Sequence, residues 1–377
     1  MRVKSELSCK VGGAIFVLML ICPGKSFAEG LKPLEYHIVE GTFLRLSGHI
    51  NMGLLIFDDG LNVYSNFVDN ENSSSRARVQ FFSTQGEWKF ETNFEVEYQP
   101  LASNEVSQLN DTPNWDFSAR NIRKAEFAVA HARFGKLWLG QGSMASDGSA
   151  EVDKSGTSMI AYSNIPDTAG GYFFRFNNGL LSDIQIGDAF TNLDGLGRKF
   201  RVRYDSPTYK GFGLRTSYGG DWLAPDDGMY DVAGVYTGDF ETFALDGAMS
   251  WSRNEASDTE VLVGSVSGLH KPTGISLTFA AGQEDTDTLS GYYGYGKLGY
   301  EHDFFDVGST AFSIDYYRGK DFAARDSEGQ SVGLAVVQNI DQANLSLWFL
   351  WRNHSYQDDN GKYRDGQAFF AGGLFRF

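Results

Sequence analysis

The stretch KFETNFEVEY, Lys89–Tyr98, decides the fold class. Its even-numbered residues are mainly aromatic or β-branched, whereas the residues between them are charged or polar. Successive side chains of a β-strand point to opposite faces, so the segment has one apolar face and one charged face. Such strict alternation predicts a strand with water on one side and an apolar environment on the other.

The same alternation recurs along the chain, at residues 44–56, 200–205, 212–218, 312–316, 345–352 and 367–377. Strands of soluble proteins usually have five or six residues, whereas a tilted strand that crosses a membrane needs about nine to eleven. Many of these segments reach about ten residues, and we count about sixteen of them after residue 28. The pattern therefore predicts an all-β fold, a transmembrane antiparallel β-barrel of about 16 strands.

The connections between these segments alternate in length. Short turns such as 84–86 and 206–208 alternate with longer connections rich in Asp, Asn and Ser, such as 58–75, 100–119 and 219–228. Short turns at one end and long loops at the other are typical of an outer-membrane barrel.

The first 28 residues have the pattern of a secretory signal peptide. A basic start is followed by the apolar run 11–21 and by Ser26-Phe27-Ala28, where small residues suit a cleavage site. We expect cleavage near Ala28, which leaves residues 29–377 as the barrel domain. Both cysteines, Cys9 and Cys22, lie in the leader.

The acidic composition limits the possible partners of the protein. The formal net charge is −16, and it becomes −19 without the leader, which contains four basic residues and one acidic residue. Because binding to duplex DNA requires a surplus of Lys and Arg, we expect no nucleic-acid partner.

Several motifs resemble those of the Gram-negative general-diffusion porins. They are FGKLWLGQG at 134–142, SGT at 155–157, RYDSP at 203–207 followed by Gly211-Phe212, and the terminal Phe377. The resemblance implies a sixteen-stranded trimeric barrel in the outer membrane, surrounded by lipid and lipopolysaccharide. It also implies a long third loop that folds into the lumen and forms a constriction, and passive diffusion of ions and small hydrophilic solutes.

The strand count depends on residues 143–197. Two strand-like pieces, 172–176 and 180–190, lie within this range, and counting them as wall strands gives 18. In the resembling family the RYDSP strand directly follows the constriction loop, so we interpret 143–197 as one internal loop with its own hairpin. An eighteen-stranded, substrate-selective channel is the alternative.

The resemblance also implies a constriction at which a basic wall faces an acidic loop, and charges lining a pore set ion selectivity. The wall candidates alternate with the apolar residues of their strands. We expect them to face the lumen, because an Arg that faces lipid costs roughly 2–4 kcal/mol at the membrane midplane. They are Arg76, Arg78, Arg201 and Arg203, with Arg45 and Arg123 as second choices. The acidic loop candidates are Asp147, Glu151 and Asp153.

The sign of the ion selectivity depends on which charges dominate. The net charge of the exported chain predicts a modest preference for cations at the mouth, whereas the arginine-rich wall opposes that preference at the constriction.

Functions other than a channel have less support in the sequence. A soluble exported β domain would also alternate, although it would not require sixteen long apolar rows. The six histidines are scattered outside G-x-S-x-G and H-E-x-x-H contexts, so the sequence predicts no enzyme. We expect no cofactor; weak Ca²⁺ candidates are Asp69, Glu71, Asp358 and Asp359 in oxygen-rich loops, where the alternative is a hydrated loop tip.

Overall fold

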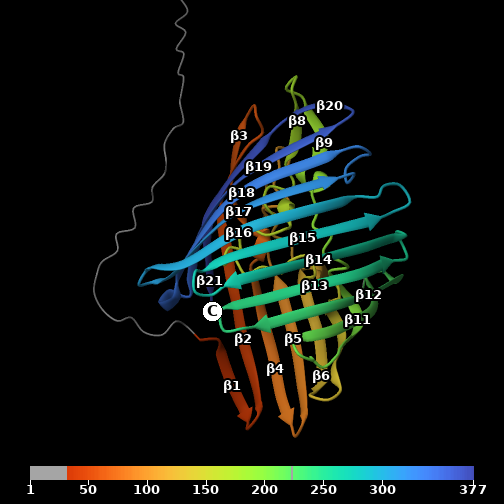
Figure 1. The fold of residues 1–377 in the computed structure, drawn as a ribbon, viewed down its shortest axis with the longest axis vertical. Coiled ribbons are helices and arrows are strands. Elements are labelled where there is room, and N and C mark those ends of the chain that lie inside the picture. Colours follow the sequence, from red (N-terminus) through yellow and green to blue (C-terminus); the bar gives the residue numbers. More distant parts are fainter. Residues whose placement is uncertain (1–31, 222–223) are drawn as a thin grey trace, which may run out of the picture.

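The computed structural model describes residues 32–221 and 224–377, with the backbone alone for 224–227 (Figure 1). The expected signal peptide, its two cysteines and its cleavage site lie outside the described residues. Within the described residues, no helix has the length and apolar character needed to cross a membrane.

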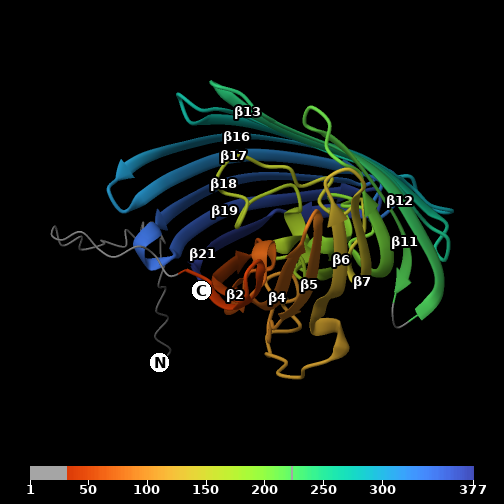
Figure 2. The same ribbon diagram turned by 90° about the horizontal axis from the view of Figure 1, so that it is seen from below.

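In the described part of the chain, sixteen antiparallel strands form a closed barrel (Figures 1 and 2). The wall strands, in order around the barrel, are β2 (Thr42–Asp58), β4 (Arg76–Gln85), β5 (Trp88–Glu97), β6 (Ile122–His131), β7 (Gly135–Ser143), β10 (Arg198–Asp205), β11 (Phe212–Asp221), β12 (Ala224–Asp239), β13 (Phe243–Asn254), β14 (Thr259–His270), β15 (Ile275–Asp285), β16 (Tyr292–Phe305), β17 (Gly308–Lys320), β18 (Glu328–Ile340), β19 (Leu345–Asp358) and β21 (Gly366–Arg376). The barrel closes where β21 pairs with β2, with Ala371 opposite Leu54. The predicted antiparallel barrel is thus confirmed.

The strand count is sixteen because β7 pairs directly with β10, with Leu139 opposite Val202. The predicted hairpin between them exists as β8 (Phe173–Phe176) and β9 (Leu181–Gln185), but it forms a separate small sheet with β20 (Gly361–Arg364). The eighteen-strand alternative is therefore wrong.

The remaining elements are not wall strands. β1 (Leu34–Val39) pairs with the start of β2, and β3 (Val63–Asp69) pairs with its end. The short helices are η1 (Glu71–Ser73), η2 (Ala119–Asn121), η3 (Ile165–Asp167), α1 (Ile186–Ala189) and η4 (Asp341–Ala343).

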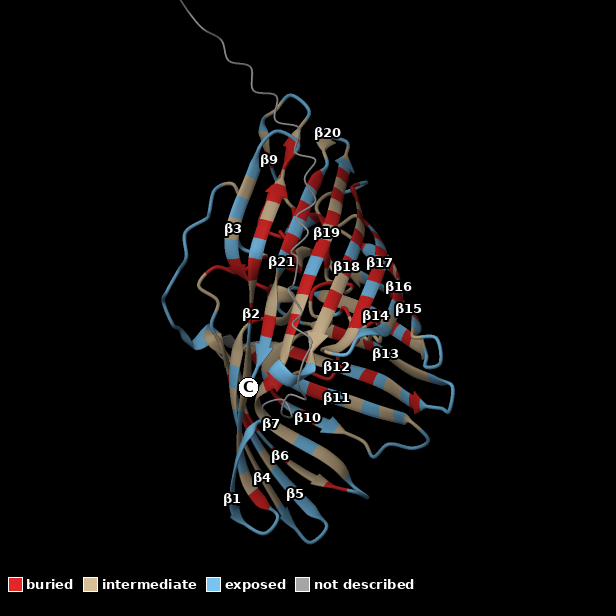
Figure 3. Cartoon of the chain, turned by 90° about the vertical axis from the view of Figure 1, so that its left-hand side faces the viewer, coloured by how far each residue is buried: buried red, intermediate tan, exposed pale blue. Residues whose placement is uncertain are grey.

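The two faces of the wall differ as the alternation predicts (Figure 3). Phe94 and Leu214 point outward, with 47% and 54% of their surface exposed, whereas Asn93 and Ser217 point inward and are buried. Large apolar residues are exposed on the outer face of strands all around the barrel. A continuous apolar outer surface of this kind requires apolar surroundings.

One long connection differs from the prediction. Residues 219–228 were expected to form a loop, but β11 continues to Asp221 and β12 begins at Ala224. Gly and Asp in this range suggested a loop, yet a strand that rises beyond the apolar band needs no apolar row. A stretch rich in Gly and Asp therefore indicates where the apolar band ends, and the strand itself can continue beyond that point.

Candidate functional site

Residues 144–197 connect β7 to β10 and run inside the ring of strands in Figure 2. They contact the inner face of the wall, which is the face opposite the exposed apolar row. The amide of Ala145 donates to Ser217 Oγ on β11 at 2.8 Å, and the amide of Val152 donates to Ser265 Oγ on β14 at 3.0 Å. Thr157 Oγ1 lies 2.8 Å from Ser313 Oγ on β17. The segment thus crosses the inner face from β11 to β17, where short serine side chains allow its backbone to approach closely.

An apolar core fixes the later part of the segment to the same side of the barrel. The ring of Tyr172 stacks on Phe57 of β2 with centroids 4.2 Å apart, and Phe190 contacts Tyr317 of β17 at 5.3 Å. All four side chains are almost fully buried. Burial of an aromatic side chain stabilises by about 1.5–3 kcal/mol, so this core holds the segment against β17, β19 and β2.

The part of the wall from β4 to β10 carries charged side chains on its inner face. The strand register places Arg78 opposite Glu95, and Glu95 opposite Lys124 of β6. Arg78 Nε donates to Glu95 at 2.6 Å. The predicted basic wall therefore carries acidic residues as well, and several arginines are already paired.

Arg76 and Arg123 complete this group of charges. Arg76 donates to the carbonyl and the hydroxyl of Ser74, both at 2.9 Å, and lies 3.9 Å from Glu95. Arg123 Nε donates to Glu95 at 2.9 Å, and its Nη1 contacts Glu97. Arg76, Arg78 and Arg123 thus gather around two carboxylates.

Arg201 and Arg203 lie against the wall and hold the base of the segment. Arg201 donates to the carbonyls of Ser143 and Gly140, both at 3.0 Å, and pairs with Glu126. Arg203 donates to Met144 O at 3.0 Å and to Asp205 at 2.7 Å. The arginines are 3% and 9% exposed, and the carboxylates of Glu126 and Asp205 largely compensate their charges.

Two glycines of β7 make room for Arg201. A Cβ on Gly142 would lie 2.9 Å from Arg201 Nη2 and 2.2 Å from Glu126 Oε2. Gly140 has φ +113°, a left-handed conformation that favours glycine. The glycines of the LWLGQG motif therefore form the surface on which this ion pair rests.

Arg45, a second choice, lies near the short-turn end of the barrel. Its Nη2 is 2.6 Å from Glu35 of β1, and its guanidinium lies 5.4 Å and 5.2 Å from the ring centroids of Phe43 and Phe82. Arg45 thus fastens β1 to the start of β2.

The predicted acidic residues of the segment lie in two places. Asp147 is half-buried and within electrostatic reach of Lys124 on the wall. Glu151 accepts a hydrogen bond from Asn192 at 3.1 Å. Asp153 is instead buried against Lys297 of β16, with a separation of 2.7 Å, an arrangement that favours a structural role.

Glu151 belongs to a cluster of carboxyl groups with raised pKa values. Burial raises the pKa of Glu151 to about 7, the charges of Asp147 and Asp167 add to the increase, and Arg198 opposes it. Burial, followed by the charge of Glu151, raises the pKa of Asp194 well above its usual range. Asp194 nevertheless accepts the amides of Gly148 and Ala150 at 2.7 and 2.8 Å.

A second pair of carboxyl groups lies beside this cluster. Burial raises the pKa of Asp167 to about 8 and that of Glu71 to about 7, and the charge of Glu71 adds to the increase at Asp167. Arg123 and Arg198 partly oppose the increase at Glu71. At neutral pH Glu71, Asp167 and Glu151 are therefore protonated to a substantial extent.

Two wall cations that the sequence analysis did not select lie within electrostatic reach of these acids. They are Lys124 of β6, near Asp147, and Arg198 of β10, near Glu71 and Glu151. Lys124 pairs with Glu95, next to the shift in register between Glu95 and Val96. Because of that shift, the alternation of the sequence does not show which side of the wall Lys124 faces. Arg198 immediately follows the segment and has the same parity as the outward Phe200, so alternation alone gives no signal for it.

The comparisons with known proteins agree with this geometry. A family model described as Gram-negative porin matches residues 17–347. The chain belongs to this family. It is therefore an outer-membrane diffusion channel, and the family and the fold are those of a channel rather than of an enzyme. No curated protein matches the sequence.

Solved structures of other bacterial proteins have the same fold as this porin. An anion-selective porin from Comamonas acidovorans aligns with TM-score 0.60 and 14% identity over 89% of this chain and 100% of that one. OmpF of Salmonella typhi in complex with daunomycin aligns with TM-score 0.53 and 13% identity, over 91% of this chain and 100% of that one. OmpT of Vibrio cholerae in its trimer form aligns with TM-score 0.55 and 14% identity, over 89% of this chain and 100% of that one. At these identities the likeness concerns the fold.

The weak Ca²⁺ candidates of this porin bond mainly to protein groups. Asp69 accepts the amide of Ser75 and the side chain of Gln99, both at 2.9 Å. Asp358 accepts two tyrosine hydroxyls at 3.0 Å, and Asp359 lies exposed beside it. Within residues 32–221 and 224–377, no three acidic, histidine or cysteine side chains are grouped so that they would hold a metal ion.

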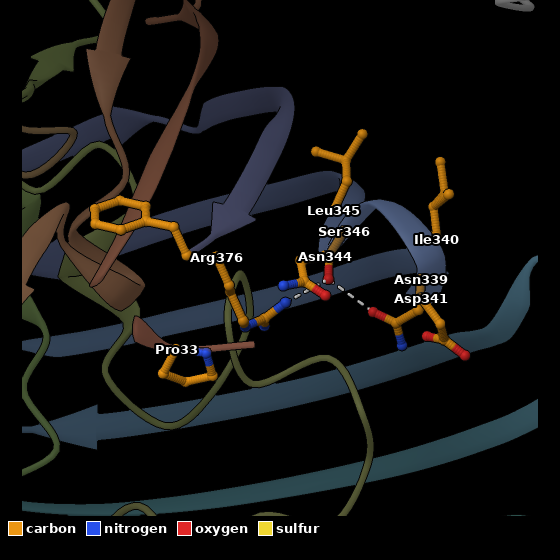
Figure 4. Close-up of a pocket in the computed structure, with 9 residues that line it drawn as sticks. Pro33, Asn339, Ile340, Asp341, Asn344, Leu345, Ser346 and Arg376 are labelled. Carbon is orange, nitrogen blue, oxygen red and sulfur yellow. Dashed lines mark hydrogen bonds between the residues drawn. The ribbon is translucent and has the colours of Figure 1, made fainter. Parts of the chain in front are cut away.

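A separate cavity of about 330 Å³ lies where the β18–β19 turn meets the last strand (Figure 4). Arg376 donates to Ser346 Oγ at 3.0 Å, and Ser346 donates to Asn339 Oδ1 at 2.7 Å. Because these polar groups bond to one another, we interpret the cavity as part of the junction between the turn and β21.

Proposed function

We propose that solutes cross this porin between the charged wall of β4–β10 and residues 144–197, which narrow the lumen. The hydrogen bonds of residues 145–157 along the inner face of the wall carry the proposal, with Asp147 within electrostatic reach of Lys124 and Glu151 within that of Arg198. Opposite charges on two sides of an aqueous passage create a transverse field that filters solutes by charge.

The arrangement supports passive diffusion rather than catalysis. His131 has structural surroundings: it bonds to Glu87, and its ring packs against the rings of Trp88 and Phe134. A substrate-selective channel remains the alternative, and specific block by one solute would distinguish it.

We propose that the working unit is a homotrimer in lipid and lipopolysaccharide, after cleavage near Ala28. The trimer form of the similar Vibrio cholerae OmpT supports this assembly. The exposed apolar outer surface supports contact with lipid.

Single-channel recording tests the function. Protein purified in detergent without boiling and added to a planar bilayer should give stepwise openings in groups of three with near-ohmic current. Current steps that a particular solute blocks would favour the selective channel. Folded protein that inserts and conducts nothing would contradict the proposal.

The charge of the passage should vary with pH. A carboxyl group whose pKa is raised stays neutral below that pKa and becomes negative above it, so Glu71, Glu151 and Asp167 gain negative charge between about pH 6 and 9. The permeability ratio of chloride to potassium should therefore fall about two- to threefold over this interval.

The reversal potential in a KCl gradient, recorded at each pH, measures this ratio. The combined variant Glu71→Gln and Glu151→Gln should show a flatter pH dependence, because the two side chains no longer titrate. An equally steep dependence in that variant would show that other groups cause the effect.

A further inference from the structure

The hairpin β8–β9 lies at the long-loop end of the barrel, beside β20 (Figures 1 and 3). There Arg175 of β8 donates to Asp59, in the connection between β2 and β3, from Nε at 3.0 Å and from Nη2 at 2.6 Å. Gln108, in the connection between β5 and β6, exchanges two hydrogen bonds of 2.9 Å with the backbone of Phe173. The hairpin therefore joins two long connections that are far apart in the chain.

A third long connection, between β19 and β21, is joined to the hairpin through β20. Tyr363 of β20 is the strand partner of Phe176, and their rings stack with centroids 4.8 Å apart. Arg364 donates to the carbonyls of Gly60 and Asn177, at 2.5 and 3.1 Å, and so bridges the first connection and the hairpin. We call this assembly of β8, β9 and β20 with Asp59 and Gln108 the latch.

The ion pair of Arg175 and Asp59 is the central contact of the latch. The two residues are only 8% and 2% exposed. The other oxygen of the Asp59 carboxylate accepts the amides of Leu61 and Asn62, at 3.0 and 2.8 Å, so the carboxylate has a fixed orientation. Removing one partner of a buried ion pair leaves an uncompensated charge and is strongly destabilising. The latched arrangement therefore depends on Arg175.

The latch is not needed to hold the part of the chain that narrows the lumen. Residues 145–157 have their own hydrogen bonds to the wall. The contacts of the latch instead fix the long connections at the outer mouth of the barrel. Free loops move within nanoseconds to microseconds, and lids open and close within microseconds to seconds. Without the latch, these connections are free to move across the mouth.

We propose that Arg175 keeps the mouth of this porin open by holding the three long connections in place. The inference rests on the proposed passage, whose outer mouth these connections border. Arg175 is a positioning residue, since it acts through the connections and not on the solute. Its loss should change how often the channel closes and leave the current through the open channel unchanged.

Single-channel recording in a planar bilayer tests this role. The variant R175Q should spend about tenfold more time in closed states than the wild type, because loss of a buried partner shifts the equilibrium between latched and unlatched states at least this far. The conductance of the open channel should stay at the wild-type value, which a misfolded barrel would not show.

A disulfide across the latch provides the rescue. The chain has no cysteine after residue 28. Phe176 and Tyr363 are antiparallel strand partners, and the Cα atoms of such partners lie about 4.5–5.5 Å apart, which suits a disulfide. In the variant R175Q/F176C/Y363C, oxidation should restore the wild-type closed fraction, and reduction with dithiothreitol should raise it again.

A matched control removes a pair of the same kind at the same end of the barrel. Arg318 of β17 donates to both oxygens of Glu328 on β18, at 3.0 and 2.8 Å, and this pair lies outside the latch. The variant R318Q should keep the wild-type closed fraction.

The outcomes distinguish the two proposals. Folded wild-type protein that forms no channel would contradict the proposed function itself. Three results would overturn the role of Arg175 alone: R175Q closes no more often than R318Q, oxidation of the cysteine pair leaves the closures unchanged, or the two cysteines do not form a bond.

Discussion

Replacing residues 147–193 by a short Gly-Ser linker should increase the single-channel conductance about two- to fivefold, because a wider aqueous path replaces the packed segment. The ends of the deletion are close enough to join, since the amide of Leu196 lies 3.0 Å from Ser146 Oγ. The charge selectivity should decrease at the same time, because Asp147 and Glu151 are removed. Planar-bilayer recording measures both quantities.

A smaller deletion provides the control. Residues 177–180 form the tip of the β8–β9 hairpin, which belongs to the small separate sheet with β20. Removing this tip should change the conductance much less than removing the whole segment. If folded barrels without residues 147–193 conduct like the wild type, then the segment does not narrow the path.

The second large effect concerns stability. Arg352 of β19 donates to both oxygens of Asp315 on β17, at 2.8 and 3.0 Å, and both side chains are almost fully buried. Arg352→Met leaves the carboxylate of Asp315 buried without its partner, so the free energy of unfolding should fall by about 3–5 kcal/mol. Urea unfolding of barrels refolded in lipid vesicles measures the change.

Two variants test the cause of that loss. The double variant R352M/D315L removes both charges and should recover much of the stability. R253Q breaks a solvent-screened surface pair and should lower the stability far less than R352M does. A loss in R352M no larger than that in R253Q would contradict the importance of the buried pair.

Most of the barrel could be predicted from the sequence because alternation is a local property. Phe94 points outward and Asn93 inward whatever lies on the next strand. Which residues face one another across strands depends on the turns. The turn between β4 and β5 was expected at 84–86, but Gln85 pairs with Trp88, so Gly86 and Glu87 form it. That shift of the turn aligns Arg78 with Glu95.

The candidate site was harder to predict for the same reason. The sequence of residues 89–98 shows that Glu95 and Glu97 lie on the charged face of a strand. That they neutralise Arg78 and Arg123 follows only from the pairing of the strands. The partner of Asp153 is Lys297, which lies 144 positions later in the chain. Such distant pairs depend on the path of residues 144–197, for which no local pattern exists.

The direct pairing of β7 with β10 also constrains how the barrel folds. From β10 to β19 each hairpin pairs near neighbours in the chain, so this part can form with little loop-closure entropy. Joining β7 to β10 encloses roughly 50 residues, a closure that costs about 3.5 kcal/mol before any contact repays it. The contacts that offset this entropic cost involve residues later in the chain, namely Asp231, Ser265 and Ser313. The N-terminal strands should therefore join the barrel late, after the sheet on which residues 144–197 rest has formed.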